Sequence, residues 1–306
     1  MTEGLGNLSA LSIDVEEWFH SANVSSRVPR SMWEDCEPTV ERNTMRMLEI
    51  LEERGIRATF FILGWIAARW PELVKAIAAD GHEIASHGYH HELVYSLTPQ
   101  AFRADVARSR AILEDISGQP VRGYRAPCFS ITDWAIEILR DEGYSYDSSM
   151  MPTFAHDRYG KLDGIDARQA VVEVREGFTE VCVSCIPLRG RGIPWGGGGY
   201  FRLAPFTLWM RGVASIHGAG LPYVFYIHPW EIDPDHPCPS GIGALNRFRQ
   251  RINLGRCEKR FAALADAFEW TTIGDLIEIW GETGPHSLSP EIAQQRNIAT
   301  NGRKKR

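Results

Sequence analysis

The stretch ATFFILGWIAARWPELVKAIAADGHEIASHGYHH, residues 58–91, decides the fold of this chain. The apolar run 58–63 predicts a buried strand, 71–79 predicts a helix that begins at a proline, and 82–85 predicts a second strand. A strand, a helix and a strand in this order indicate two parallel strands joined by a helical crossover. The stretch therefore predicts a parallel sheet.

The same alternation continues on both sides of this stretch. Further strands are predicted over 8–13, 121–124, 144–146, 223–227 and 270–272, and further helices over 39–54, 99–117, 134–142, 205–219, within 246–267 and over 274–279. Two apolar runs, 170–174 and 179–186, predict a hairpin or a small sheet. The fold class is α/β, with one domain over 1–284 that includes a distinct segment at about 165–245. Residues 285–306 are predicted to be a disordered basic tail.

Length and composition exclude several classes of protein. With 306 residues the chain can hold one α/β barrel, and 44% hydrophobic and 24% charged residues form an ordinary globular balance. The net charge of −6 disfavours nucleic-acid binding, because phosphate contacts need a concentrated basic face. No apolar run approaches the roughly 20 residues that span a bilayer, so the chain is predicted to be cytoplasmic and without stable membrane insertion. Its six cysteines are predicted to be free thiols, and the oligomeric state stays open.

The histidines His87 and His91 are the first sign of chemistry. Two imidazoles four residues apart converge on one metal ion if the backbone between them turns like a helix. An acidic run, Asp-Val-Glu-Glu at 14–17, follows the first predicted strand. Since side chains alternate along a strand, Asp14 and Glu16 share one side, where one carboxylate can bind a cation and the other can take a proton from water. Together these residues predict a hydrolase that activates water with a metal ion.

Other residues carry weaker signals. The glycine run 196–199 has no phosphate-loop lysine, so it either brings backbone close to a substrate or forms a tight turn between packed strands. Cys182 and Cys185 have metal-like spacing, but there is no second pair and a strand sends them to opposite faces. His90 is adjacent to His91 and is expected to point elsewhere. The remaining histidines are predicted to be structural or to lie at the surface, namely His20, His82, His156, His217, His236 and His286.

Four motifs follow one another along the chain: Asp-Val-Glu at 14–16, Ser-His-Gly-Tyr-His-His at 86–91, Tyr-Arg-Ala-Pro at 124–127 and Ile-His-Pro-Trp at 227–230. Their order resembles that of the polysaccharide deacetylases, the carbohydrate esterases with a NodB homology domain. The resemblance spans residues 11–231 and implies a distorted (β/α) barrel of seven strands with a β- and glycine-rich insertion. The segments 193–202 and 228–231 are similar to a subgroup found with bacterial exopolysaccharide biosynthesis and exosortase-type systems.

The resemblance implies a role for several matched residues. Asp14 corresponds to the catalytic base, Arg125 to the arginine that keeps this base ionised, and His228 to the general acid for the departing amine. The backbone N–H of Cys128 corresponds to a hydrogen-bond donor to the oxyanion. Asp147 falls near a further motif whose acid orients the site.

The resemblance also implies a metal site. His87 and His91 correspond to metal ligands. Many members carry a second aspartate as the third ligand where this chain has Val15, and Glu16 takes that place by the strand period of two. The implied cofactor is one divalent cation, Zn²⁺ first, with Co²⁺, Ni²⁺ or Mn²⁺ as alternatives. The residues expected to contact the saccharide are Trp195, Tyr200, Arg202 and Trp230.

The implied reaction is hydrolysis of N-acetyl groups on an amino-sugar polysaccharide or its precursor, so the expected partner is a polysaccharide or oligosaccharide. An alternative on the same fold is an allantoinase-like hydrolase of cyclic amides. A third possibility is a carbohydrate-binding barrel without catalysis, which only Val15 supports. The glycine–tryptophan segment favours the sugar, and the full set of base, ligands, arginine and acid favours an enzyme.

Overall fold

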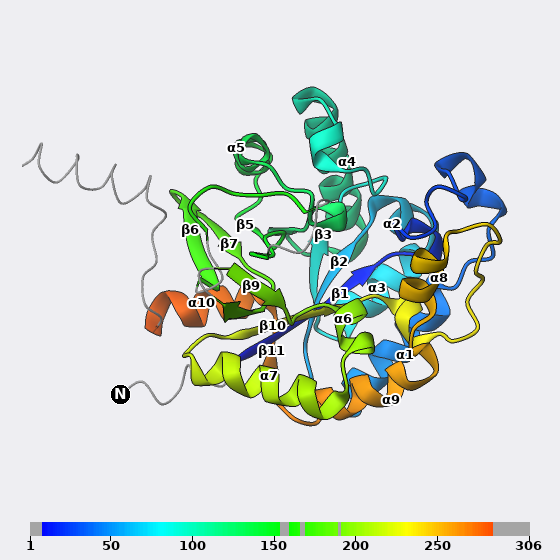
Figure 1. Ribbon diagram of the computed structural model, residues 1–306. Coiled ribbons are helices and arrows are strands. Elements are labelled where there is room, and N and C mark those ends of the chain that lie inside the picture. The colour runs from blue at the N-terminus through cyan, green and yellow to red at the C-terminus, as the bar shows by residue number, and fades with distance from the viewer. Residues whose placement is uncertain (1–7, 154–158, 166–168, 189–190, 284–306) are drawn as a thin grey trace, which may run out of the picture.

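A sheet of mostly parallel strands runs through the centre of the molecule, and helices cover its outer side (Figure 1). The computed structural model describes residues 8–153, 159–165, 169–188 and 191–283. The strands are β1 (Ser9–Val15), β2 (Thr59–Ile62), β3 (Glu83–Ser86), β4 (Gly123–Tyr124), β5 (Tyr146–Asp147), β6 (Val171–Arg175), β7 (Phe178–Val181), β8 (Cys185–Leu188), β9 (Arg191–Pro194), β10 (Tyr223–Ile227) and β11 (Trp270–Thr271).

The main sheet has the order β10-β1-β2-β3-β4-β5-β7-β6, with β11 paired to β1. Every pairing is parallel except that of β6 with β7. The α/β class predicted from the sequence is confirmed. Within the described residues this sheet has nine strands rather than seven, because the two strands of the β6–β7 hairpin join it through β5. All seven residues of β1 are buried, as expected for a strand covered on both faces.

The helices lie around this sheet (Figure 1). They are α1 (Val40–Glu52), α2 (Gly64–Arg69), α3 (Pro71–Ala79), α4 (Pro99–Ser117), α5 (Asp133–Asp141), α6 (Gly198–Leu203), α7 (Phe206–Gly218), α8 (Ala244–Arg251), α9 (Leu254–Ala265) and α10 (Ile273–Thr283). Helices α1, α3, α4 and α5 pack against one another in turn. The helical region predicted within 246–267 is interrupted at Asn253, whose φ of 52° lies in the left-handed region and separates α8 from α9.

Residues 182–184 connect the two ends of the sheet. The N–H of Val183 donates to the carbonyl of Met150 over 2.9 Å, just after β5, and the N–H of Ser184 donates to the carbonyl of Val224 in β10 over 3.2 Å. The strand predicted over 179–186 is therefore two strands, because the residues between β7 and β8 bond to neighbours on both sides instead of continuing either strand. β8 pairs with β9 in a separate ribbon.

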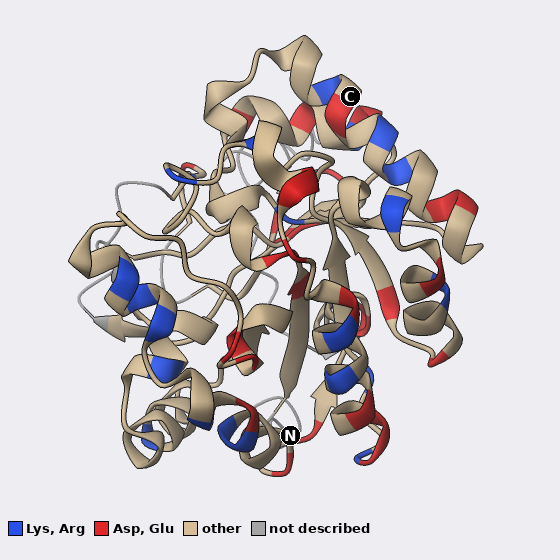
Figure 2. Ribbon diagram, turned by 90° about the vertical axis from the view of Figure 1, so that its right-hand side faces the viewer, with Lys and Arg blue, Asp and Glu red and all other residues tan. Residues whose placement is uncertain are grey.

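The outer surface is of mixed charge. Figure 2 shows Lys and Arg interspersed with Asp and Glu on the helices that face the viewer. The ion pair Arg46–Glu258, at 2.7 Å, joins α1 to α9. The ion pair Arg54–Asp266, at 2.8 Å, joins the residues that follow these two helices. Among the described helices, none is both long enough and apolar enough to cross a membrane. The predicted basic tail, together with His156 and His286, lies outside the described residues.

Candidate metal centre and active site

The polar residues singled out in the sequence gather at the carboxyl ends of four strands. Asp14 is the second-last residue of β1 and Glu16 lies just beyond this strand, while His87, Arg125 and His228 directly follow β3, β4 and β10. Parallel strands bring their carboxyl ends to one edge of the sheet, which is why residues far apart in the chain meet here. A pocket of about 390 Å³ opens at this edge.

Glu16, His87 and His91 form a compact cluster whose ligand atoms all lie within 4.8 Å of one another. The Oε2 atom of Glu16 lies 2.7 Å from Nε2 of His91 and 4.0 Å from Nε2 of His87. This buried oxygen accepts no well-directed hydrogen bond from the described residues. One carboxylate oxygen and two imidazole nitrogens form a donor set typical of a catalytic zinc site, so these residues fit a divalent cation.

The protonation of His87 suits a metal ligand. Its Nδ1 lies 2.8 Å from the backbone carbonyl of Arg125. Since a carbonyl oxygen only accepts, Nδ1 carries the proton and Nε2 keeps a lone pair directed at Glu16 and His91. Burial lowers the pKa of His87 to about 4, against the opposing effect of Asp14, so the imidazole is neutral at neutral pH.

The two histidines converge without a helix. Residues 87–91 form a loop in which Gly88 has φ 75° and His91 has φ 56°, both in the left-handed region. The helix-like turn considered from the spacing is therefore wrong, although the convergence itself occurs. The loop is held by Asp105, whose Oδ2 accepts the N–H of Tyr89 over 2.7 Å. A Cβ at Gly88 would lie 3.0 Å from the same oxygen, which explains the glycine.

Asp14 is held by Arg125. The Nη1 group of this fully buried arginine donates to Asp14 Oδ1 over 2.6 Å and to Ser12 Oγ over 2.8 Å. On its other side, Nε donates to the carbonyl of Ser148 over 2.8 Å and Nη2 donates to the hydroxyl of Ser148 over 2.9 Å. The guanidinium is thereby fixed from two sides, and it fixes Asp14 at the pocket.

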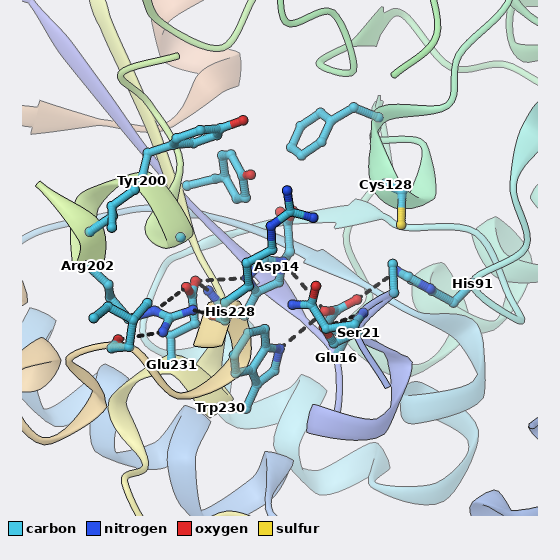
Figure 3. A pocket seen from close by; sticks show the side chains of 18 of the residues that line it. Asp14, Glu16, Ser21, His91, Cys128, Tyr200, Arg202, His228, Trp230 and Glu231 are labelled. Carbon is cyan, nitrogen blue, oxygen red and sulfur yellow. Dashed lines mark hydrogen bonds and ion pairs between the residues drawn. The ribbon is translucent and has the colours of Figure 1, made fainter. Parts of the chain in front are cut away.

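His228 belongs to a chain of three charged groups (Figure 3). Its Nδ1 lies 2.9 Å from Oε2 of Glu231, and Oε1 of Glu231 accepts a hydrogen bond from Nε of Arg202 over 2.8 Å. Burial lowers the pKa of His228, but the carboxylates of Glu16 and Glu231 outweigh burial and raise it to about 9. Burial likewise raises the pKa of Glu231, but Arg202 and His228 bring it down to about 2. At neutral pH the pair is therefore an imidazolium and a carboxylate.

Arg202 lines the pocket, yet its donors are used inside the protein. Besides its bond to Glu231, Nη1 donates to the carbonyl of Ile252 over 2.7 Å and Nη2 to that of Arg249 over 3.1 Å. The residue is 1% exposed. Direct binding of saccharide by Arg202 stays a prediction. The contacts favour a role in which Arg202 holds Glu231, which in turn contacts His228.

The three predicted aromatic contacts have different positions. Tyr200 lines the pocket and is partly exposed. Trp230 also lines it, but its Nε1 donates to Glu16 Oε1 over 3.2 Å and its ring stacks on His228 at 5.3 Å. Trp195 is not among the pocket residues: it stacks on Trp209 at 4.9 Å and donates to the backbone carbonyl of Trp209. Contact of Trp195 with the saccharide stays a prediction, and its ring packs against Trp209 of α7.

The loop around Cys128 is strained. Cys128 has φ 51° and Phe129 has φ 58°, a conformation that non-glycine residues adopt only when the surrounding structure holds them there. Both residues line the pocket, within the turn Pro127–Phe129. Donation from the backbone N–H of Cys128 to an oxyanion remains a prediction.

Several other expectations can be compared with the structure. All six cysteines are free. His20 is structural, as predicted: its Nδ1 accepts the N–H of Glu17 over 3.0 Å, and its ring packs among Trp33, Trp65 and His91. The glycine run 196–199 leads into α6 and is no tight turn between strands.

Sequence reasoning missed the roles of Glu231 and Ser148. The position of Glu231, three residues after His228, was a usable signal, because the intervening turn Pro229–Ile232 brings the two side chains together. Ser148 directly follows Asp147 in the sequence, but nothing there indicates that both its oxygens hold Arg125.

Two family models match the chain. The model described as Polysaccharide deacetylase matches residues 24–146, and a domain of unknown function, DUF3473, matches residues 148–278. The first match includes His87, His91 and Arg125, and lies between Asp14 and His228. The segment 24–146, which is less than half of the chain, is thus similar to the polysaccharide deacetylase family.

Curated relatives show the same similarity over about a third of this chain. A peptidoglycan deacetylase-like protein of Gibberella zeae is 36% identical over 107 residues, which are 34% of this chain and 32% of the relative. The peptidoglycan deacetylase of Helicobacter pylori is 30% identical over 106 residues, 35% of this chain and 36% of the relative. A chitooligosaccharide deacetylase of Bradyrhizobium is 34% identical over 97 residues, 31% of this chain and 43% of the relative. The chain thus spans about a third to under half of the length of these relatives.

A solved structure matches almost the whole fold. A Mycobacterium smegmatis protein assigned as a polysaccharide deacetylase superposes with a TM-score of 0.61 at 21% identity, over 93% of this chain and 94% of that one. The similarity supports the distorted barrel fold and says nothing of the chemistry.

Proposed function

We propose that this protein is a divalent-metal-dependent deacetylase that removes N-acetyl groups from an amino-sugar polysaccharide or its precursor. The observation that carries the proposal is one pocket lined by three groups: the Glu16–His87–His91 cluster, Asp14, which pairs with the buried Arg125, and His228 with Glu231. Hydrolysis of an amide needs an activated nucleophile, charge stabilisation and a proton for the leaving amine. Each group can supply one of these.

Glu16, His87 and His91 would hold the cation, which when bound supplies Lewis acidity toward water and the acyl oxygen. Asp14 lies outside this ligand set, and its contact with Arg125 keeps one of its oxygens in place while the other can accept the proton of a water molecule. His228 carries a proton at neutral pH and lies at the pocket, so it can donate that proton to the sugar nitrogen. Base and acid thus come from the neighbouring strands β1 and β10.

The rim of the pocket suits an extended saccharide. Leu203 is 54% exposed and Phe248 is 50% exposed, and both line the pocket beside Tyr200. Such apolar surface can cover the faces of sugar rings, whereas a small cyclic amide would not reach it. The similarity of 193–202 and 228–231 to exopolysaccharide-associated deacetylases supports a polymer of bacterial exopolysaccharide biosynthesis as substrate.

The test is release of acetate from N-acetylated chito-oligosaccharides by the purified protein supplied with Zn²⁺, compared with the Asp14→Asn variant and with cyclic ureides as substrates. We expect acetate from the oligosaccharides only, and none from the variant. Hydrolysis of the ureides alone would favour the cyclic-amide alternative. Saccharide binding without acetate release under any metal would favour the non-catalytic barrel.

A further inference from the structure

Two carboxyl groups lie side by side within the sheet, near Arg125. Asp147 in β5 is directly opposite Glu180 in β7, and both side chains are fully buried. Neither residue lines the pocket, and the chemistry proposed above uses neither. The Oδ2 atom of Asp147 and the Oε2 atom of Glu180 have no ordinary hydrogen-bond partner among the described residues.

The other oxygen of each group is well satisfied. Oε1 of Glu180 accepts the N–H groups of Ser149 and Met150, over 3.1 and 2.8 Å. Oδ1 of Asp147 accepts the hydroxyl of Ser149 over 2.6 Å. The remaining oxygens, Oδ2 of Asp147 and Oε2 of Glu180, are close enough for the two side chains to form a hydrogen bond with each other. Two bare carboxylate oxygens both accept, so such a bond requires one proton.

We propose that Asp147 and Glu180 share one proton and act together as positioning residues for Arg125. The catalytic part of this inference rests on the function proposed above, whereas the shared proton does not. The carboxyl pair fixes residues 149 and 150, and its Glu180 member does so from β7, which lies in the DUF3473 segment rather than in the deacetylase segment.

The path from the pair to the site consists of hydrogen bonds. Ser149 Oγ, which donates to Asp147, accepts the N–H of Ala126 over 2.7 Å. The carbonyl and hydroxyl of Ser148 accept two hydrogen bonds from Arg125. Arg125 in turn holds Asp14 with its guanidinium and His87 with its carbonyl.

Burial raises the pKa of both carboxyl groups, and the charge of Asp147 raises the pKa of Glu180 further. The charged group that faces them most directly is Arg125, which favours an ionised Asp147, and the phenol of Tyr124 lies close enough to sense the charge of Asp147. These influences place the proton preferentially on Glu180. One negative charge then remains beside the positive charge of Arg125.

The geometry allows a matched set of variants. In Glu180→Gln, the amide oxygen can keep both backbone N–H groups while the NH₂ donates to Asp147, which replaces the shared proton. In Asp147→Asn, the NH₂ donates to Glu180 in the same way. In the double variant Asp147→Asn/Glu180→Gln, two NH₂ groups face each other and the bond is lost.

We therefore expect kcat to stay within about threefold of wild type in either single variant and to fall by roughly 10- to 100-fold in the double variant, with KM nearly unchanged. Single variants as inactive as the double variant would overturn the inference. Should the double variant fail to fold, two measurements on Glu180→Gln alone still decide.

The first measurement is the infrared difference spectrum of wild type minus Glu180→Gln at neutral pH, which should contain the C=O band of a protonated carboxyl group. The second is the pH dependence of the melting temperature. A raised carboxyl pKa makes wild-type stability fall as pH rises from the unfolded value toward the folded one, and glutamine removes this loss. The melting temperature of Glu180→Gln relative to wild type should therefore rise from pH 5 to 9. No carboxyl band, or a constant difference in melting temperature, would contradict the shared proton, whether or not the protein proves to be a deacetylase.

Discussion

Nδ1 of His87 donates its proton to the backbone carbonyl of Arg125 over 2.8 Å. The residue that holds Asp14 with its side chain therefore also fixes, with its main chain, the tautomer of a candidate metal ligand. Base and metal cluster are coupled through a single residue at the end of β4. A variant of the ligand His87 should lose the metal, whereas a variant of the base Asp14 should lose only proton transfer.

Replacing His87 by alanine should abolish metal binding and acetate release together, because two ligand atoms cannot enclose the cation that three would hold. The measurement is metal content of the purified protein by elemental analysis. His90→Ala is the matched control, since its ring packs on Tyr89 and it is not in the ligand cluster. Metal retained at wild-type stoichiometry in His87→Ala would refute the ligand assignment.

Asp14→Asn should behave in the opposite way. Asparagine keeps the size of the side chain and can accept from Arg125, but it is too weak a base to take a proton from water. We expect kcat to fall by about 10²- to 10⁴-fold while metal content stays that of wild type. Steady-state kinetics and elemental analysis on the same preparation test this. A variant with near-normal kcat would remove Asp14 from the role of base.

Glu231→Gln should change the pH dependence of the reaction. The carboxylates of Glu16 and Glu231 raise the pKa of His228 against the effect of burial, so removing one charge lowers that pKa. A general acid must be protonated to act, and activity is lost as pH rises through its pKa. The alkaline limb of the kcat–pH profile should therefore move to lower pH by about one unit. An unchanged limb would mean that another group supplies the proton.

Arg202→Lys separates two roles for this arginine. Lysine can pair with Glu231 but cannot also reach the carbonyls of Arg249 and Ile252 in the same geometry. If Arg202 acts through Glu231, kcat should fall by roughly tenfold with KM for chito-oligosaccharides nearly unchanged. Tyr200→Phe, at the same pocket, serves as a control for direct substrate contact. A large rise in KM with unchanged kcat would instead establish Arg202 as a saccharide ligand.

The sequence predicts the parts of the site that follow from periodicity and strand order. Asp14 and Glu16 share the pocket because side chains alternate along an extended segment, and His87, Arg125 and His228 join them because parallel strands end at one edge. The α/β class follows from the same alternation of strands and helices. These features can be predicted because they depend on the pattern of residues along the chain.

The remaining features depend on packing between distant segments. Trp195 looks like a sugar platform in the sequence, but Gly212 on α7 leaves a space that its ring fills: a Cβ there would lie 2.1 Å from Trp195 Nε1. Arg202 is expected from the sequence to contact the saccharide, yet its guanidinium donates to carbonyl groups of the α8–α9 region. Glu180 gives no local signal at all, since its partner Asp147 is found only when β7 pairs with β5.

The register of β7 against β5 has one more consequence. The two family matches meet between residues 146 and 148, inside the hydrogen-bonded sheet rather than at a linker. A fragment that ends at residue 146 would lack β7, so β5 would be an unpaired edge strand. The guanidinium of Arg125 would also lose both of its acceptors on Ser148. We therefore expect that neither matched segment folds stably without the other, because β5 and Arg125 each need a hydrogen-bond partner from residues beyond 146.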